Sequence, residues 1–223
     1  MEIRTAGENA LIAYLGEAID EAVLGRVQRF AAALAPRLGR ELTDLIPAYH
    51  SLTLVYHPQR IRRSALVRLL REIDLEDAPP PAGRLHELPV WYGAPGAPDL
   101  PRVAERAGLS EAEVVALHSN TAYRVYAIGF APGFAYLGLV DPRLATPRLA
   151  TPRLRVPAGA VGIADRQTAV YPLPSPGGWN LIGRCPLPLF DPRRTPPTPF
   201  AVGDRVRFRP IGEAEFRALG GRP

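Results

Sequence analysis

Apolar residues in the first 73 positions recur with two periods, and each period predicts one kind of element. Alternate apolar positions are typical of half-buried strands, whereas apolar residues at every third or fourth position are typical of amphipathic helices. The segments that fit are strands at 3–15 (one or two, with a turn at 7–9), 42–47 and 51–56, and helices from Asp20 to an end at Pro36 and Gly39, and at 62–73. The order β-α-β-β-α predicts a small ferredoxin-like α/β sandwich.

A proline-rich run at 77–83 interrupts these patterns. Proline stiffens a connecting segment, and domain boundaries fall in such segments because few contacts cross them. We therefore expect two domains, residues 1–82 and residues 83–223.

Beyond this run the pattern changes to short strands separated by glycine and proline turns. A strand at 84–92 comes first, and it is followed by a helix at 100–107 that Asp99 can cap and by a helix at 110–118 that opens with a capping box. The remaining expected strands lie at 123–129, 161–164, 168–171, 181–183, 186–190 and 205–209. Many short strands at this spacing predict a β-barrel, so the expected fold class is α+β.

The pentapeptide Ala-Thr-Pro-Arg-Leu occurs twice in succession, at 145–149 and 150–154. A residue before proline is held extended, and proline cannot donate to a sheet, so the repeat predicts an edge or a rim. The run from Arg143 to Arg155 carries four arginines and no acidic residue. Such a run could receive an acidic partner or a small anion.

Two loops have neither a helical nor an alternating period. The first reads Gly-Phe-Ala-Pro-Gly-Phe-Ala-Tyr at 129–136, and the second reads Ser-Pro-Gly-Gly-Trp-Asn at 175–180. Glycine permits unusual backbone conformations and proline fixes them, so aromatic residues placed among both give a rigid apolar surface. We expect the two loops to line one pocket.

All 27 basic residues of the Lys+Arg count are arginine, and this excludes several functions. Without lysine the chain has no P-loop lysine, no Schiff-base lysine and no biotinyl-lysine. The arginines are scattered, which favours a solvated surface over a nucleic-acid interface. No apolar run approaches a membrane span, no signal peptide opens the sequence, and the single Cys185 excludes an internal disulfide; these features suggest a soluble cytoplasmic protein.

Candidate catalytic groups are few. The four histidines are far apart and lack zinc-like spacing, so we expect no metal site. Ser175 before Pro-Gly-Gly could be an exposed nucleophile, although the same residues are ordinary turn chemistry. His118 ends a predicted helix just before the first loop. It could exchange protons in a pocket, or it could be protonated and stabilise the helix C-terminus.

Polar residues near the two loops suit a small anionic or amide-containing ligand. Arg155 and Arg184, with Gln167 and Asn180, could bind a carboxylate or carbamoyl group, because arginine is the usual bidentate partner of such groups. Each arginine could equally be a surface residue.

A series of motifs resembles the PxpB/KipI family, also called allophanate hydrolase subunit 1 or the carboxyltransferase C–D region. The motifs, in order, are His118, Tyr123–Tyr126, Gly129–Gly138, Asp141–Arg143, Arg155–Gly159, Val161–Ala164, Gln167–Thr168, Tyr171–Pro172 and Ser175–Arg184. The resemblance implies a cyclophilin-like barrel in the second domain. It also implies the PxpB component of a bacterial ATP-dependent 5-oxoprolinase, which opens 5-oxo-L-proline to L-glutamate together with PxpA-like and PxpC-like subunits.

The same resemblance leaves alternatives open. One is a KipI-like inhibitor of a sensor histidine kinase, and another is a carboxyltransferase-type subunit that acts on urea- or allophanate-like substrates. In the 5-oxoprolinase interpretation the chain is a non-autonomous subunit without a cofactor of its own, while the assembled complex uses ATP. The expected site has His118 as its catalytic residue and the following residues for substrate or partner binding: Tyr126, Phe130, Pro132, Gly133, Phe134, Tyr136, Arg155, Gln167, Thr168, Ser175, Pro176, Gly177, Gly178, Trp179, Asn180 and Arg184.

Overall fold

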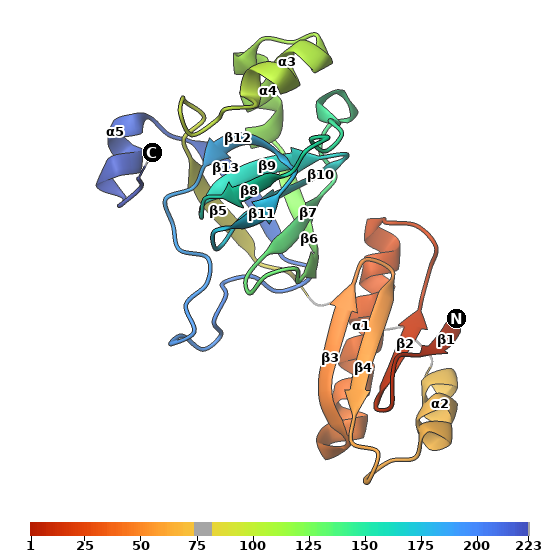
Figure 1. Ribbon diagram of the computed structural model, residues 1–223. Coiled ribbons are helices and arrows are strands. Elements are labelled where there is room, and N and C mark those ends of the chain that lie inside the picture. The colour runs from red at the N-terminus through yellow and green to blue at the C-terminus, as the bar shows by residue number, and fades with distance from the viewer. Residues whose placement is uncertain (74–81, 223) are drawn as a thin grey trace. The chain divides into compact units, whose positions relative to one another are not determined.

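The computed structural model describes residues 1–73 and 82–222. Contacts divide the chain into two compact units, Met1–Gly83 and Arg84–Pro223 (Figure 1). Most of the predicted proline-rich linker at 77–83 lies outside the described residues.

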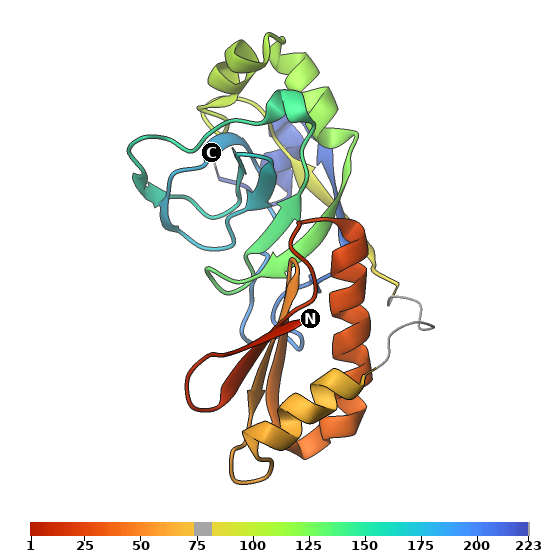
Figure 2. The same cartoon turned by 90° about the vertical axis from the view of Figure 1, so that its right-hand side faces the viewer.

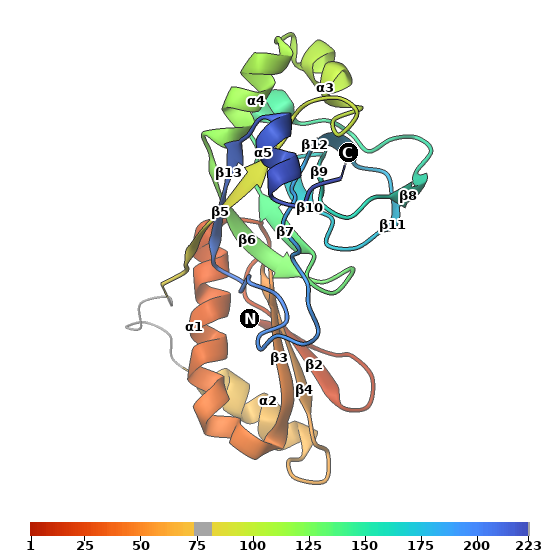
Figure 3. The ribbon, with the colours of Figure 1, turned by 90° about the vertical axis from the view of Figure 1, so that its left-hand side faces the viewer.

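The first unit is a four-stranded antiparallel sheet with both of its helices on one face (Figures 2 and 3). The sheet order is β1-β2-β4-β3. Leucines from the strands pack against Phe30 and Leu34 of one helix and Leu66 and Leu70 of the other, which buries the apolar stripes that the sequence shows. The elements are β1 (Glu2–Thr5), β2 (Ala10–Tyr14), α1 (Glu21–Leu38), a 3-10 turn (Gly39–Glu41), β3 (Leu42–Ala48), β4 (Ser51–Tyr56) and α2 (Arg63–Glu72).

The predicted elements of this unit are confirmed, with one correction. Asp20 caps α1 by accepting a hydrogen bond from the Val23 amide, but Pro36 does not end the helix. The helix continues through its last turn to Leu38, and Gly39 at a φ of 42° ends it. Strand β1, which comes before both helices in the chain, pairs with β2 and forms one edge of the sheet. The α+β class is confirmed, whereas the ferredoxin-like name stays a prediction.

The second unit is built on a seven-stranded sheet that nearly closes into a barrel (Figure 1). Its order is β12-β9-β10-β7-β6-β13-β5, and within it the β13–β5 pair is parallel while the other pairs are antiparallel. The two edges meet where Trp91 and Arg184 exchange backbone hydrogen bonds of 2.8 Å. The strands are β5 (Leu85–Val90), β6 (Ala122–Ile128), β7 (Ala135–Gly138), β9 (Ala160–Ala164), β10 (Gln167–Val170), β12 (Asn180–Arg184) and β13 (Arg205–Pro210).

Helices flank this barrel, and two of them, α3 and α4, lie together at one end (Figure 1). The helical elements are α3 (Leu100–Ala107), α4 (Glu111–Ser119), a 3-10 turn (Pro142–Leu144) and α5 (Glu213–Ala218). The predicted capping box of α4 is confirmed, because Ser110 and Glu113 exchange hydrogen bonds. The α5 helix is not in the sequence prediction, and its Phe216 packs on Trp91 with 5.2 Å between ring centroids.

A separate two-stranded ribbon, β8 (Arg153–Val156) and β11 (Ser175–Gly177), lies beside the barrel (Figure 3). The second Ala-Thr-Pro-Arg-Leu repeat therefore leads into an edge strand, as predicted, because β8 pairs with β11 alone. The strand predicted at 186–190 is wrong, since those residues form no strand. Pro186 and Pro188 lack the amide hydrogens that a sheet requires. The cyclophilin-like name for the barrel stays a prediction.

Asp99 has a different role from the predicted helix cap, because its side chain makes no capping hydrogen bond. One carboxylate oxygen accepts from Arg153 at 2.8 Å, and the other accepts from the Leu181 amide at 2.7 Å. Asp99 is only 8% exposed, the Leu181 amide is buried, and the Arg153 side chain is half-buried. The carboxylate therefore joins α3, the ribbon and β12.

Replacing Asp99 with alanine should destabilise the second unit by about 2 kcal/mol, because a half-buried arginine and a buried backbone amide would lose their acceptor. Denaturant unfolding followed by tryptophan fluorescence measures this, since Trp91 and Trp179 both lie in that unit. Arg102→Ala, on the exposed side of α3, is the matched control. Equal stability of the two variants would contradict the assignment.

Candidate functional site

The two loops that the sequence analysis singled out line one pocket in the second unit, as predicted. Its volume is about 100 Å³, which is enough for several water molecules or one small organic acid. The lining residues are Phe130, Phe134 and Tyr136 from the first loop, Pro176, Gly177, Gly178 and Trp179 from the second, and Arg148 and Tyr171 from between them.

Five aromatic rings form the walls, and Phe134 is the ring that contacts the other four. Its centroid lies 4.9 Å from Tyr136, 5.3 Å from Tyr171 and 5.7 Å from Trp179, all in edge-to-face geometry. Phe130 completes the set at 5.3 Å. Edge-to-face pairs are favourable because the positive edge of one ring meets the negative face of another. The walls are therefore held in fixed orientations before any ligand arrives.

Backbone conformation explains why the loops need glycine. A side chain at Gly177 would collide with the Tyr171 hydroxyl, and one at Gly133 would come within 2.8 Å of the Leu189 carbonyl. Gly133 also has a φ of 81°. Phe130 has a positive φ of 68° without being glycine, and its ring is 65% exposed. Unfavourable backbone conformations of this kind gather at functional sites.

The polar groups of the pocket are suited to binding. Burial raises the pKa of Tyr136, and it raises the pKa of Tyr171 to about 12. Both phenols are therefore protonated at neutral pH and can donate hydrogen bonds. Arg148 supplies a positive charge, and its guanidinium carbon is 6.0 Å from the Trp179 ring centroid. None of the described lining residues is Asp, Glu, His or Cys.

Asn180 and Thr168, two of the predicted binding residues, are completely buried and act in the framework. The Asn180 amide nitrogen donates to the carbonyls of Pro147 at 3.0 Å and Ile163 at 3.1 Å. The Thr168 hydroxyl donates to the Gly162 carbonyl at 3.0 Å. Each side chain fixes the strands and loops around the pocket without reaching its surface.

His118, the predicted catalytic residue, lies in the core of the second unit. Its ring stacks on Phe208 at 4.5 Å, and its side chain is completely buried. Nε2 donates to the Thr168 oxygen at 2.9 Å, and Nδ1 accepts from the Tyr92 hydroxyl at 2.8 Å. Burial lowers the pKa of His118 to about 3, so the ring is neutral. Neither a proton-transfer role in the pocket nor a protonated helix cap fits this environment.

Ser175 does not have the surroundings of an activated nucleophile. Its hydroxyl is buried at the start of β11 and has no hydrogen-bond partner among the described residues. Both nitrogens of His118 are already bonded elsewhere. A serine nucleophile needs a base within hydrogen-bond distance, so the turn interpretation of Ser175 fits better.

The other predicted residues lie outside the lining of the pocket. Arg155 and Pro132 are exposed, Tyr126 is buried, and Gln167 is half-buried on β10. Arg184 is half-buried and donates to the carbonyl of Arg222. Burial lowers the pKa of its guanidinium. The carboxylate-binding role predicted for Arg155 and Arg184 thus has no support from their position.

Arg148 and Tyr171 line the pocket but were missed as site residues. Arg148 is the arginine of the first Ala-Thr-Pro-Arg-Leu repeat, so the repeat was a signal for it. Arg148 and Arg153 occupy equivalent positions in the two repeats. Only the three-dimensional structure shows that Arg148 lines the pocket while Arg153 pairs with Asp99. Tyr171 lies at the end of the predicted strand at 168–171, and nothing in its spacing indicates that its ring reaches the pocket.

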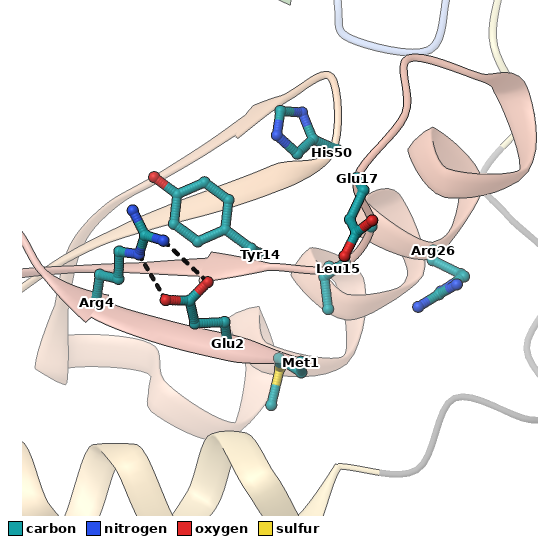
Figure 4. A pocket seen from close by; sticks show the side chains of 9 residues that line it. Met1, Glu2, Arg4, Tyr14, Leu15, Glu17, Arg26 and His50 are labelled. Atoms are coloured by element: carbon teal, nitrogen blue, oxygen red, sulfur yellow. Dashed lines mark hydrogen bonds and ion pairs between the residues drawn. The ribbon is translucent and has the colours of Figure 1, made fainter.

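A second, larger pocket of about 670 Å³ lies in the first unit (Figure 4). Glu2 and Arg4 form a bidentate ion pair on its wall, with bonds of 2.7 and 3.1 Å, and the Arg4 guanidinium lies over the Tyr14 ring. Glu17, Arg26 and His50 add further polar groups. None of the predicted site residues lies in this pocket.

Metal ligands and membrane-spanning helices are both missing from the described part of the chain. Within residues 1–73 and 82–222, no three His, Cys, Asp or Glu side chains are placed to hold a metal ion. In the same residues, no helix is long and apolar enough to cross a membrane.

Comparison with known proteins gives consistent matches. The model of the family "carboxyltransferase domain, subdomain C and D" matches residues 1–200. The chain is 44% identical over 208 residues to the B subunit of 5-oxoprolinase from Escherichia coli O157:H7, covering 93% of this chain and 94% of that protein. It is 40% identical over 230 residues to the B subunit of 5-oxoprolinase from Bacillus subtilis, covering 97% and 95%.

Solved structures agree on the fold. The crystal structure of TTHA0988 matches with a TM-score of 0.80 and 44% identity over 95% of this chain, which spans 40% of that longer chain. The urea amidolyase of K. lactis matches with a TM-score of 0.78 over 97% of this chain, which spans 15% of that protein. At 19% identity this second match concerns the fold alone.

The environment of His118 predicts a specific loss of stability at low pH. The unfolded chain takes up a proton on this histidine near pH 6.5, whereas the folded chain does so only near pH 3. Protons therefore favour unfolding as the pH falls below 6.5, by on the order of 2 kcal/mol at pH 5. Denaturant unfolding at pH 7.5 and pH 5 should show a smaller pH dependence for His118→Gln than for the unaltered protein. Equal dependence would contradict a buried neutral ring.

Proposed function

The chain belongs to the carboxyltransferase subdomain C and D family, which its motifs predicted as PxpB/KipI, and we propose that it is the B subunit of a 5-oxoprolinase. The observation that carries the proposal is the match to two proteins of that name over more than nine-tenths of their length and of this chain. In this role the chain helps to cleave 5-oxo-L-proline to L-glutamate with ATP.

The chain acts as a non-autonomous subunit. Ring opening of a lactam requires activation of an unreactive amide, and coupling to ATP requires a nucleotide site. The chain has no lysine for a phosphate cradle, and the described lining of its aromatic pocket offers no general acid or base at neutral pH. We assign the ATP-dependent chemistry to PxpA-like and PxpC-like partner subunits in the cytoplasm. That TTHA0988 carries a homologous segment within a longer chain supports such an assembly.

The contribution of this chain is binding and orientation. The two loops present aromatic faces to a flat five-membered ring, and the protonated Tyr136 and Tyr171 hydroxyls can donate to its polar atoms. A pocket of about 100 Å³ suits a ligand of this size. Holding a substrate in the reactive orientation lowers the barrier without any covalent role for the chain.

The alternatives have less support. No contact among the described residues favours docking of a histidine kinase. The alternative of a KipI-like kinase inhibitor therefore has no structural observation in its favour. The likeness to urea amidolyase concerns the fold alone, and it does not extend urea or allophanate chemistry to this chain.

Reconstitution tests the function directly. The chain is purified with the PxpA-like and PxpC-like subunits from the same genome, and ATP hydrolysis is measured with and without 5-oxo-L-proline. Substrate-dependent hydrolysis and glutamate release should require all three subunits. Full activity in a mixture that lacks this chain would contradict the proposal.

A further inference from the structure

We propose that Arg148 anchors the carboxylate of the ligand in the aromatic pocket, with the ring of the ligand held against Trp179 and the two tyrosines. This inference rests on the proposed function for the identity of the ligand, 5-oxo-L-proline. It assigns recognition of the negative charge to a residue that lies outside every motif used to predict the site.

The charge of Arg148 is available to a ligand. The guanidinium lines the pocket, is exposed, and makes no hydrogen bond or ion pair with any described residue. Its neighbours in the arginine-rich run differ, because Arg143 is paired with Asp141 and Arg153 with Asp99, both at 2.8 Å. The fourth arginine of the run, at position 155, is exposed but does not line the pocket. Among these four, Arg148 alone combines an uncompensated charge with a place in the pocket.

The backbone around Arg148 is fixed on both sides by the second loop. The carbonyl of Pro147 accepts from the Asn180 side chain at 3.0 Å, and the amide of Leu149 donates to the Gly178 carbonyl at 2.7 Å. Arg148 is thereby attached to the wall that Trp179 forms. A fixed backbone at this position keeps the base of the Arg148 side chain at the pocket, so that the guanidinium remains within reach of a ligand.

The tandem repeat gives its two arginines different tasks. Arg153 donates to Asp99 and, at 3.4 Å, to the carbonyl of Trp179. It therefore holds the backbone of the tryptophan, while Arg148 lies near the ring of the same tryptophan. Arg153 is a positioning residue, and Arg148 is the residue that meets the ligand.

The ligand class follows from these groups. A guanidinium binds a carboxylate through two parallel hydrogen bonds, and aromatic faces accept a flat ring. The volume limits the ring to a small one. A cyclic amide with a carboxylate next to the ring nitrogen has every feature needed. The same lactam without the carboxylate, 2-pyrrolidinone, lacks the group that Arg148 recognises.

The kinetic test uses the reconstituted three-subunit complex. Arg148→Ala should raise the KM for 5-oxo-L-proline by about 10- to 100-fold, the loss expected for a charge-assisted bidentate contact. Arg148→Lys should be intermediate, because an ammonium restores the charge without the planar fork. Added guanidinium ion should lower the KM of Arg148→Ala. Arg102→Ala, an exposed arginine of α3, is the matched control and should match the unaltered complex.

A binding test on the full chain separates this inference from the proposed function. Tryptophan fluorescence is followed while 5-oxo-L-proline or 2-pyrrolidinone is added. Saturable quenching by the acid, absent with 2-pyrrolidinone and with Arg148→Ala, supports the inference even if the complex proves not to need the chain.

Other results overturn it. An active complex in which Arg148→Ala leaves the KM unchanged would refute the carboxylate contact and leave the proposed function intact. Loss of complex assembly in Arg148→Ala, at an unchanged KM of the remaining complex, would show that Arg148 meets an acidic group of a partner protein. Equal quenching by 2-pyrrolidinone and 5-oxo-L-proline would show that the charge is not recognised.

Discussion

The geometry of the pocket depends on the side-chain amide of Asn180. Its nitrogen donates to Pro147 in the first pentapeptide repeat and to Ile163 in β9, so one buried group joins the second loop, the repeat and the barrel. A buried carbonyl without a partner is costly, and this amide satisfies two. Trp179 is adjacent to Asn180 in the sequence, and Arg148 is adjacent to Pro147. Arg153, which pairs with Asp99, donates a further hydrogen bond to the Trp179 carbonyl. Asn180 was predicted to bind the ligand itself. Its side chain instead positions the neighbouring residues that line the pocket.

A pocket built in this way binds and does not carry out acid–base chemistry. Its walls are aromatic rings packed edge to face, its hydroxyls stay protonated at neutral pH, and the one charged side chain among its described lining residues is an arginine. His118, which could have supplied proton transfer, has both ring nitrogens engaged in the core. These groups suit this chain to binding the substrate. Acid–base catalysis then falls to the partner subunits, because the amide bond of a lactam is not broken by binding alone.

Local patterns were enough to predict most elements and the meeting of the two loops. Glycine, proline and aromatic residues determine loop shape through short-range sterics, so the pocket could be inferred from the sequence. What could not be inferred depends on contacts between distant segments. Asp99 has the sequence position of a helix cap, yet Arg153 and Leu181 use its carboxylate instead. Arg148 and Arg153 occupy equivalent places in the repeat, and only the barrel decides which one is paired. The short α5 helix, whose Phe216 packs on the barrel, has too few residues to show a helical period.

The proposed site for a small cyclic acid combines the two loops with Arg148. A crystal structure of the assembled complex with 5-oxo-L-proline tests it most directly. We expect the ring of the ligand against Trp179 and the two tyrosines of the pocket, with both carboxylate oxygens on the Arg148 guanidinium. Ligand bound elsewhere in the complex, with this pocket filled only by water, would contradict it.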